Sequence, residues 1–264
     1  MTDWYADKFG TSFGFALSDS EDGRIVNGIT TNGHSYRDFE LLPVEKPVIE
    51  PAKVDEHYVE IPGMDGRIDM TESLDGVVHY KTRKGLFRFV SIGRDNWDAV
   101  FKRLKSRLHG KKTEIVLDED PTGYYKGRLS VEKPEYDYKT TKATYEVTGN
   151  LEPYKYEFNA TDEDWLWDTF DFENGVIREY GNIEIDGTLD VEIIGSDMPV
   201  TPDIKLLSGS ATVTFTGHTG SPITLRSGSN LDQLYELILR DNATITLHFA
   251  GSGTVSISYE TGWL

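Results

Sequence analysis

The chain has 264 residues, a formal net charge of −18 at pH 7 and no cysteine. The lack of cysteine excludes disulfides, thiol catalysis and zinc sites built on thiolates. The acidic balance argues against nucleic-acid binding, because affinity for phosphates comes largely from Lys and Arg.

The charge is unevenly distributed along the chain. Residues 1–157 contain 23 basic and 28 acidic side chains, whereas residues 158–264 contain 4 and 17. A chain of this length accommodates two domains, each large enough to bury its own core. We therefore predict domains at 1–157 and 158–264 that meet different neighbours.

Short β-like runs alternate with turn signals before residue 96. Tyr36–Leu42 and Leu86–Ile92 have the pattern of strands. The three prolines of Pro43–Pro51 predict an extended linker or arm. Val59–Ile61 ends at a predicted turn, and a second turn is expected at Asp65-Gly66.

One amphipathic helix is predicted at Asn96–Leu108, with Asp95 as N-cap and Gly110 just past its end. Its apolar stripe consists of Trp97, Val100, Phe101, Leu104 and Leu108. Its remaining surface carries Lys102, Arg103, Lys105 and Arg107. We interpret this basic face as solvated. The alternative is a surface for anionic lipid or an acidic partner.

Beyond Gly110 the pattern is β throughout, which predicts a mostly β fold with one clear α-helix. The predicted strands are Thr113–Leu117, Lys126–Val131, Ala143–Thr148, Ile183–Ile194, Ala211–Thr216, Leu234–Leu239, Thr244–Ala250 and Thr254–Tyr259. In the last of these, Val255, Ile257 and Tyr259 are expected on one face. Gly217–Gly220 and Gly251–Gly253 are predicted hairpin turns.

An apolar strand running into D-x-D-x-T raises the possibility of a magnesium-dependent phosphotransferase, with Asp118 as nucleophile and Asp120 as acid/base. The same residues begin like a calcium loop, but Leu129 occupies the twelfth position, where a bidentate Glu is required. No downstream helix is available to build the parallel α/β sheet that the enzyme needs. We favour an acidic turn in which Pro121 and Gly123 set the chain reversal.

A second group suggests a sugar site, because carboxylates lie among aromatic side chains. It comprises Asp162, Glu163, Asp164, Asp168 and Asp171 with Trp165, Trp167, Phe170 and Phe172. Burial of the aromatic residues in a core or an interface explains the pattern adequately. No serine-nucleophile elbow or phosphate-binding glycine loop is present. We predict no catalytic, cofactor-binding or metal-ligating residues.

Several sequence words, in order along the chain, resemble those of one protein family. They are Y-V-E-I-P-G-M-D-G at Tyr58–Gly66, the segment Asp69–Arg83, H-G-K-K at His109–Lys112, I-V-L-D-E-D-P at Ile115–Pro121, Y-Y-K-G-R at Tyr124–Arg128, E-P-Y-K-Y-E at Glu152–Glu157 and the ending Gly251–Leu264. Together they resemble the distal tail proteins of siphophages (the Dit family), although Val176–Leu247 matches only loosely.

The resemblance implies an N-terminal β-sandwich with a helix, followed by a C-terminal galectin-like β-sandwich. The first domain would form a homo-oligomeric ring, a hexamer, that continues the tail tube and docks to the tail-associated lysin or tail fibre hub. The second would point outward, either to hold receptor-binding proteins or as a vestigial sugar-binding scaffold. The protein would be a non-enzymatic component of the virion at the phage tail tip, assembled in the host cytoplasm, without cofactor, specific nucleic acid or membrane insertion.

Two alternatives of other classes remain at this stage. A carbohydrate-binding host-adhesion module of the tail tip would need exposed aromatic side chains on the C-terminal sandwich. A phosphatase or glycosidase would need acidic residues that converge in a pocket.

Overall fold

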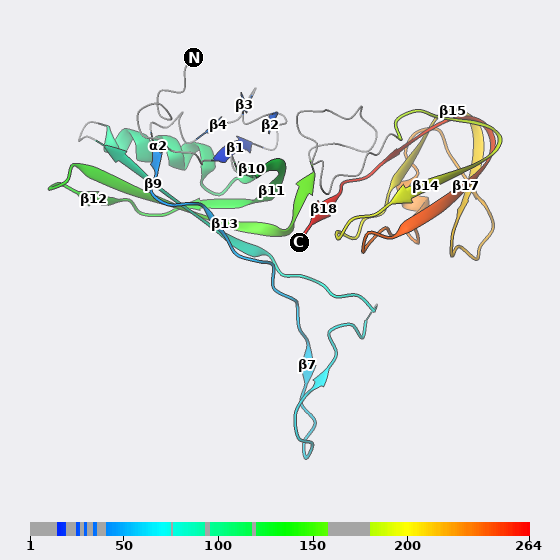
Figure 1. The fold of residues 1–264 in the computed structure, drawn as a ribbon, viewed down its shortest axis with the longest axis horizontal. Helices are drawn as coiled ribbons and strands as arrows, with labels where there is room; N and C mark the ends of the chain where they lie inside the picture. Colours follow the sequence, from blue (N-terminus) through cyan, green and yellow to red (C-terminus); the bar gives the residue numbers. More distant parts are fainter. Residues whose placement is uncertain are drawn as a thin grey trace. The chain divides into compact units, whose positions relative to one another are not determined.

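The computed structural model describes residues 41–74, 76–92, 96–117, 120–157 and 180–264. Before residue 41 it describes the backbone of four short strands, β1 (Phe15–Asp19), β2 (Ile25–Val26), β3 (Ile29–Thr30) and β4 (His34–Ser35). The chain divides into two compact units, Met1–Tyr154 and Lys155–Leu264. The described residues are mostly β with one α-helix, and they form two main sheets (Figure 1).

The first unit is built on a sheet in the order β4-β1-β10-β11-β13-β9-β5, with β12 beside β13 and β6 beside β9. Its strands after residue 41 are β5 (Leu42–Pro43), β6 (Val48–Ile49), β9 (Arg83–Ile92), β10 (Lys112–Leu117), β11 (Asp120–Val131), β12 (Glu135–Asp137) and β13 (Lys142–Glu157). The predicted strand Tyr36–Leu42 lies almost wholly outside the described residues.

Alternate residues of β9 and β13 form the centre of this unit's core. In the antiparallel register Phe87 lies opposite Val147, and Phe89 lies opposite Tyr145. All four side chains are buried, as the two-residue period of a strand allows. Helix α2 (Trp97–Leu108) packs its buried side chains into the same core.

Helix α2 begins one residue later than predicted. Its N-cap is Asn96 and not Asp95, and Asn96 has a φ of 79°, in the left-handed region that Asn tolerates better than most residues. The helix ends at Leu108 and Gly110 follows with a φ of 77°, which confirms the predicted stop. Four of the five stripe residues are buried, whereas Phe101 is only half-buried at the edge of the core.

The proline-rich segment Pro43–Pro51 is not a free linker, contrary to one of its predicted roles. Strand β5 overlaps the start of this segment and β6 lies within it, and both strands pair with β9. The backbone N–H of Val44 donates to the carbonyl of Arg88, and that of Glu50 donates to Lys84. The prolines are accommodated because these strands are short and pair on one side only.

Strands β10 and β11 pair antiparallel, and their last described pair is Leu117 with Asp120. Pro121 and Gly123 lie inside β11 and do not set the reversal, although an acidic reversal at this point was predicted. A register shift between Ile115 and Leu117 accommodates the irregular start of the hairpin.

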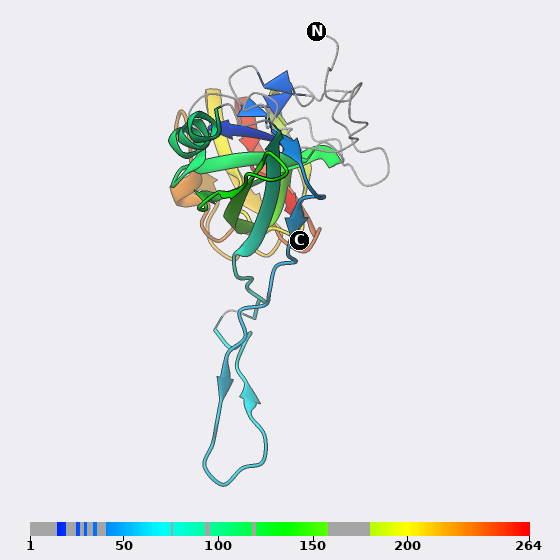
Figure 2. The same ribbon diagram turned by 90° about the vertical axis from the view of Figure 1, so that its left-hand side faces the viewer.

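A long arm, residues 50–82, leaves the sheet of the first unit between β6 and β9. Near its base Val54 bridges to Tyr80, and farther out β7 (Tyr58–Val59) pairs with β8 (Ile68–Asp69). The glycines of the two predicted turns both have positive φ, which lets the chain reverse. Figures 1 and 2 show the arm extending away from the sheet on the side opposite α2.

The second unit contains a four-stranded antiparallel sheet in the order β14-β17-β15-β16. Its elements are β14 (Ile183–Ile194), β15 (Asp203–Phe215), β16 (Ile223–Thr224), the 3-10 helix η3 (Leu231–Gln233), β17 (Thr244–Ser258) and β18 (Gly262–Trp263). Strand β18 pairs with Lys155 and Tyr156. The predicted inward residues Val255, Ile257 and Tyr259 are all buried.

The predicted hairpin turn at Gly251–Gly253 is wrong, because both glycines lie inside the continuous strand β17. Gly187 of β14 pairs with Gly251, and Gly209 of β15 pairs with Gly253. Positive φ at three of these four positions marks a kink that crosses three adjacent strands. Residues on both sides of the kink belong to one apolar core, so the glycines let long strands wrap a single core.

The predicted strand Leu234–Leu239 is also wrong. This segment follows η3 as an irregular connection, with one isolated bridge between Val200 and Leu239. Leu234, Leu237 and Leu239 are fully buried, so a short apolar run was mistaken for a strand. Buried Asn230 holds the connection in place by donating to the carbonyls of Ile204, Arg226 and Gly228.

Candidate functional site

The sequence motifs that suggested enzymes do not converge on a described site. Asp118 and the acidic–aromatic residues 162–172 lie outside the described residues, so the interpretations of both stay predictions. Leu129 is a fully buried core residue and offers no ligand at the twelfth position of the candidate calcium loop.

Across the part of the chain that the structure describes, no three His, Asp or Glu side chains come close enough together to hold a metal ion. Its one α-helix is too short and too polar to cross a membrane.

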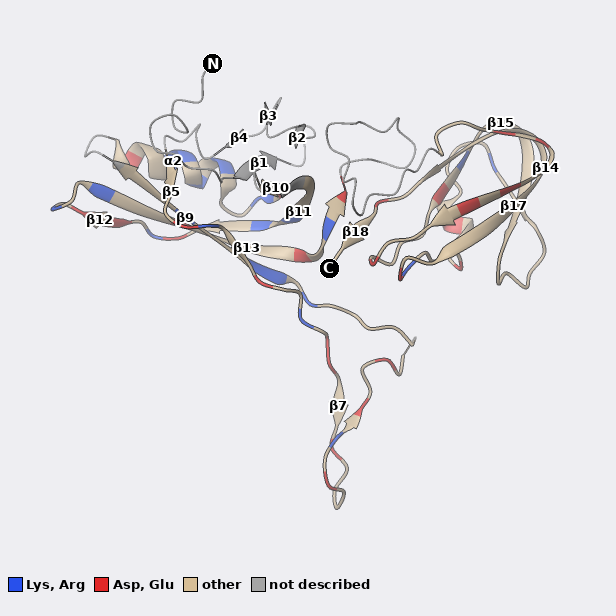
Figure 3. Cartoon of the chain, in the orientation of Figure 1, with Lys and Arg blue, Asp and Glu red and all other residues tan. Residues whose placement is uncertain are grey.

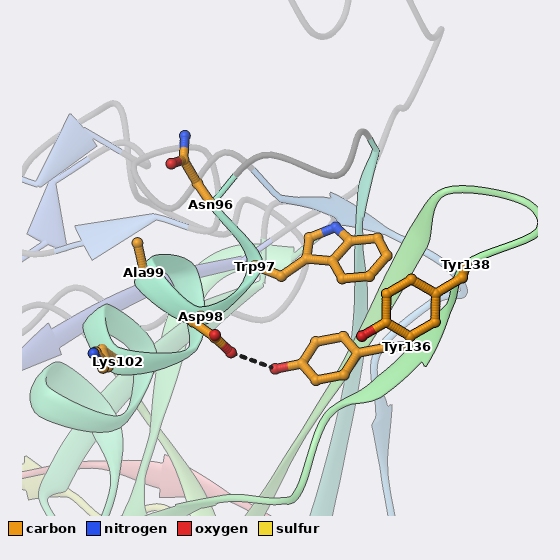
Figure 4. A pocket seen from close by; sticks show the side chains of 7 residues that line it. All are labelled: Asn96, Trp97, Asp98, Ala99, Lys102, Tyr136 and Tyr138. Carbon is orange, nitrogen blue, oxygen red and sulfur yellow. Dashed lines mark hydrogen bonds between the residues drawn. The ribbon is translucent and has the colours of Figure 1, made fainter.

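An aromatic cleft of about 540 Å³ opens between the start of α2 and the β12–β13 hairpin. It is lined by Asn96, Trp97, Asp98, Ala99, Lys102, Tyr136 and Tyr138 (Figure 4). The Trp97 and Tyr136 rings are stacked, with centroids 5.1 Å apart and planes within 3°. Tyr138 approaches Trp97 at 5.4 Å with its ring tilted by 59°.

The polar groups of this aromatic cleft favour binding over catalysis. The Tyr136 hydroxyl donates a hydrogen bond to Asp98 Oδ1 at 3.3 Å. Partial burial is the main cause that raises the pKa of Tyr136, and this hydrogen bond to the Asp98 carboxylate is the second cause. Tyr138 is 64% exposed at the rim, and Lys102 contributes an exposed ammonium group. The lining residues contain no nucleophile paired with a general base, and therefore lack the arrangement that covalent catalysis requires.

The arm exposes many large apolar side chains to solvent. Seven large apolar side chains, each between 37% and 93% exposed, lie within residues 58–74. They are Tyr58, Val59, Ile61, Met64, Ile68, Met70 and Leu74. An exposed apolar cluster of this kind is a candidate interaction surface.

Hydrogen bonds between residues 57 and 71 hold the two strands of the arm together. The backbone N–H of His57 donates to Thr71 Oγ1, and that of Met70 donates to the carbonyl of His57. Arg67 and Glu60 form an ion pair at 2.9 Å between the nitrogen and the carboxylate oxygen. A two-stranded hairpin is marginally stable alone in water, so packing against a further surface would stabilise the arm.

The basic face of α2 is exposed, as predicted. Lys102, Arg103, Lys105 and Arg107 are all exposed, and the blue segments of α2 in Figure 3 mark the positions of Lys and Arg along this helix. The arm has the opposite charge, because residues 55–76 contain seven acidic side chains and one basic side chain, Arg67. The basic helix was predicted from the sequence, but an arm at residues 50–82 was not. The sequence feature that indicates it is a run of apolar and acidic residues on both sides of two glycine turns.

The carbohydrate-binding alternative depended on aromatic side chains of the second unit. Tyr235 is 69% exposed there, whereas Tyr259 is buried and Tyr180 is half-buried against it. The tryptophans and phenylalanines of the predicted sugar site fall outside the described residues. Tyr235 alone does not form a platform of several rings, and the carbohydrate-binding alternative stays a prediction.

No family model matches the chain, and no curated protein matches it significantly. Among solved structures, it is similar to Dit (gp 19.1) of phage SPP1, presented as a paradigm of the hub adsorption apparatus in phages that infect Gram-positive bacteria. The match covers 95% of this chain and 99% of that chain, with a TM-score of 0.53 and 14% sequence identity. This chain has a distal tail protein fold.

The match confirms the resemblance stated from the sequence words at the level of the fold. A mostly β chain with one clear helix was predicted, and the described residues are mostly β with one α-helix and two main sheets that resemble the Dit fold. The galectin-like character of the second unit and the ring-forming role of the first stay predictions.

Proposed function

We propose that this chain is a structural component of a phage tail tip or baseplate, a hub that joins the tail tube to the host-recognition apparatus. The observation that carries the proposal is the similarity to Dit over nearly the full length of both chains. The ordered sequence words support it independently, because they depend on residue identities and not on the fold.

Within this proposal, copies of the first unit assemble into a closed hexameric ring. The exposed apolar side chains of the arm support an assembly of this kind, because they need a covering surface. A head-to-tail contact between identical chains produces a ring when its rotation closes. The ring would continue the tube and dock to the tail-associated lysin or tail fibre hub.

The second unit, proposed as a galectin-like sandwich, would face receptor-binding proteins. Its acidic composition, 4 basic against 17 acidic side chains in residues 158–264, supports neighbours different from those of the first unit. A hub needs matching surfaces and no catalytic centre.

Two measurements test the proposal. Native mass spectrometry over a range of concentrations should detect closed oligomers, with six copies as the expected species. Cryo-electron microscopy of complete tail tips that contain an epitope-tagged chain should place it in a central ring between the tube and the distal tip. A position outside the central ring contradicts the proposed function, whatever the oligomeric state in solution.

A further inference from the structure

We propose that the tip of the arm of one copy docks in the aromatic cleft of the next copy, with Met64 inside the cleft and Asp65 paired with Lys102. This inference rests on the proposed ring and names the contact that closes it. It assigns a role to two exposed surfaces of the first unit, the apolar arm and the cleft beside the basic face of α2.

The tip of the arm presents an apolar side chain next to an unpaired charge. Met64 is 45% exposed and lies between the two glycine turns. Asp65 is exposed and has no ion-pair or hydrogen-bond partner among the described residues. The nearby Glu60 and Arg67 neutralise each other at 2.9 Å, so Asp65 is the tip carboxylate that still lacks a cation.

The aromatic cleft offers the complementary groups. Its volume of about 540 Å³ accommodates Met64 together with a neighbouring apolar residue such as Ile61. A methionine side chain adapts to irregular space, and its sulfur makes favourable contacts with aromatic rings such as those of Tyr136 and Tyr138. Lys102 on the rim forms no ion pair within the described part of the chain, and it supplies the cation that Asp65 lacks.

One acidic residue of the cleft does not oppose this pairing. Asp98 already accepts the hydrogen bond of the Tyr136 hydroxyl, and it lies in the first turn of α2, where the partial positive charge of the helix stabilises a carboxylate. The net balance of α2 is basic, with Lys102, Arg103, Lys105 and Arg107 against Asp98. The helix therefore attracts the acidic arm, whose residues 55–76 have seven acidic and one basic side chain.

The occupant is the arm of a second copy and not the arm of the same chain. Figures 1 and 2 show the arm leaving the sheet on the side opposite α2. A contact between one patch on each copy and a different patch on its neighbour is heterologous, which is the type that generates rings. A protein partner of different sequence would make the cleft a docking site of another kind, and the experiment separates these outcomes.

Site-directed disulfide formation tests the contact, because the natural chain contains no cysteine that could react instead. Two single variants of the full chain, Met64→Cys and Ala99→Cys, are mixed and oxidised. Ala99 lines the cleft and is exposed, so docking of the tip brings the two sulfurs within bonding distance. We expect a covalent heterodimer from this mixture. Met64→Cys with Lys133→Cys is the matched control, because Lys133 is exposed on the same unit and is not among the residues that line the cleft.

Charge exchange tests the predicted ion pair in the same assay. Adding Lys102→Glu to the Ala99→Cys chain should reduce the rate of heterodimer formation by about tenfold, because a charge pair across an interface becomes a repulsion. Adding Asp65→Lys to the Met64→Cys chain should then restore most of the rate. Lys133→Glu, which changes the net charge equally, should have little effect.

The outcomes separate the inference from the proposed function. Heterodimers that form equally with the Lys133→Cys control, or not at all in purified protein and in assembled tail tips, overturn the docking inference. If the chain still occupies a central ring in the tail tip, the proposed function stands and the ring is closed by another contact. A chain found outside that ring removes both.

Discussion

Gly209 of β15 pairs with Gly253 of β17, and neither position has room for a side chain. A Cβ atom on Gly209 would overlap the carbonyl oxygen of Ser252, and one on Gly253 would overlap that of Ser208. The two backbones therefore approach more closely than any other residue pair would permit. This approach lets the sheet of the second unit bend around its core.

Gly253→Ala should destabilise the second unit by about 2–4 kcal/mol, because the added methyl group must displace backbone atoms. Urea denaturation monitored by circular dichroism measures the change. The neighbouring Ser252→Ala is the control, since Ser252 is exposed and should vary by less than about 0.5 kcal/mol. Equal stability of the two variants would show that the strands do not approach each other in this way.

Leu104→Ala should cost about 2–5 kcal/mol, because Leu104 is 1% exposed in the core of the first unit. Phe101→Ala should cost less, about 1–3 kcal/mol, since Phe101 is only half-buried. The sequence pattern alone places Phe101 in the buried stripe. Thermal and urea unfolding of both variants test the order of the two effects. A larger loss for Phe101→Ala would mean that α2 is rotated relative to this structure.

Reversing Lys102 and Lys105 to Glu should leave the fold almost unchanged, within about 1 kcal/mol, because both side chains are exposed. Unfolding curves at low protein concentration measure this monomer stability. Native mass spectrometry of the same variant should show weakened assembly if Lys102 contacts the neighbouring arm. Unaltered assembly would support the solvated-face interpretation of the helix instead.

Tyr145→Phe should change the stability of the first unit in a pH-dependent way. The Tyr145 hydroxyl donates to the carbonyl of Trp97 at 3.1 Å, so its loss should cost about 1 kcal/mol at neutral pH. Burial raises the pKa of Tyr145 above its ordinary value of 10.0. The folded state thus retains the phenolic proton longer than the unfolded chain does.

The raised pKa of Tyr145 makes the folded state less stable as the pH becomes alkaline. The stability contributed by the neutral phenol is complete below pH 10.0 and is lost as the pH rises through the higher folded-state value. Wild-type stability should therefore fall faster than that of Tyr145→Phe in alkaline solution. Urea titrations at neutral and alkaline pH provide the comparison, with Tyr138→Phe as the exposed control. Parallel pH profiles for wild type and Tyr145→Phe would contradict the raised pKa.

Local patterns were enough for elements whose contacts are local. The period of 3.6 residues in Trp97–Leu108 predicted α2 and its buried side, because one helix face meets one core. Ile183–Ile194 was predicted with the bounds that β14 has. Asn96, and not Asp95, became the N-cap because the backbone enters the helix through a left-handed residue, which no pattern of side chains reveals.

The sequence alone does not specify the backbone conformation at Gly251 and Gly253. Gly251–Gly253 fits a hairpin turn as well as it fits a kink inside a strand, because glycine permits both conformations. Only the pairing of Gly253 with Gly209 decides between them, and that pairing joins segments far apart in the chain. The apolar run Leu234–Leu239 was ambiguous for a related reason, since burial of leucines does not specify a strand.

The sequence by itself determined the β-rich class, the single helix in the described residues, the basic face of that helix and the resemblance to distal tail proteins. These features follow from the short-range periodicity of apolar residues and from short sequence motifs, each within one segment of the chain. The tertiary structure decided that the arm stands away from the sheet and that Trp97 and Tyr136 stack to line a cleft beside Lys102. Exposure and cavities depend on which distant segments cover a residue, and that is a property of the assembled fold and not of any segment alone.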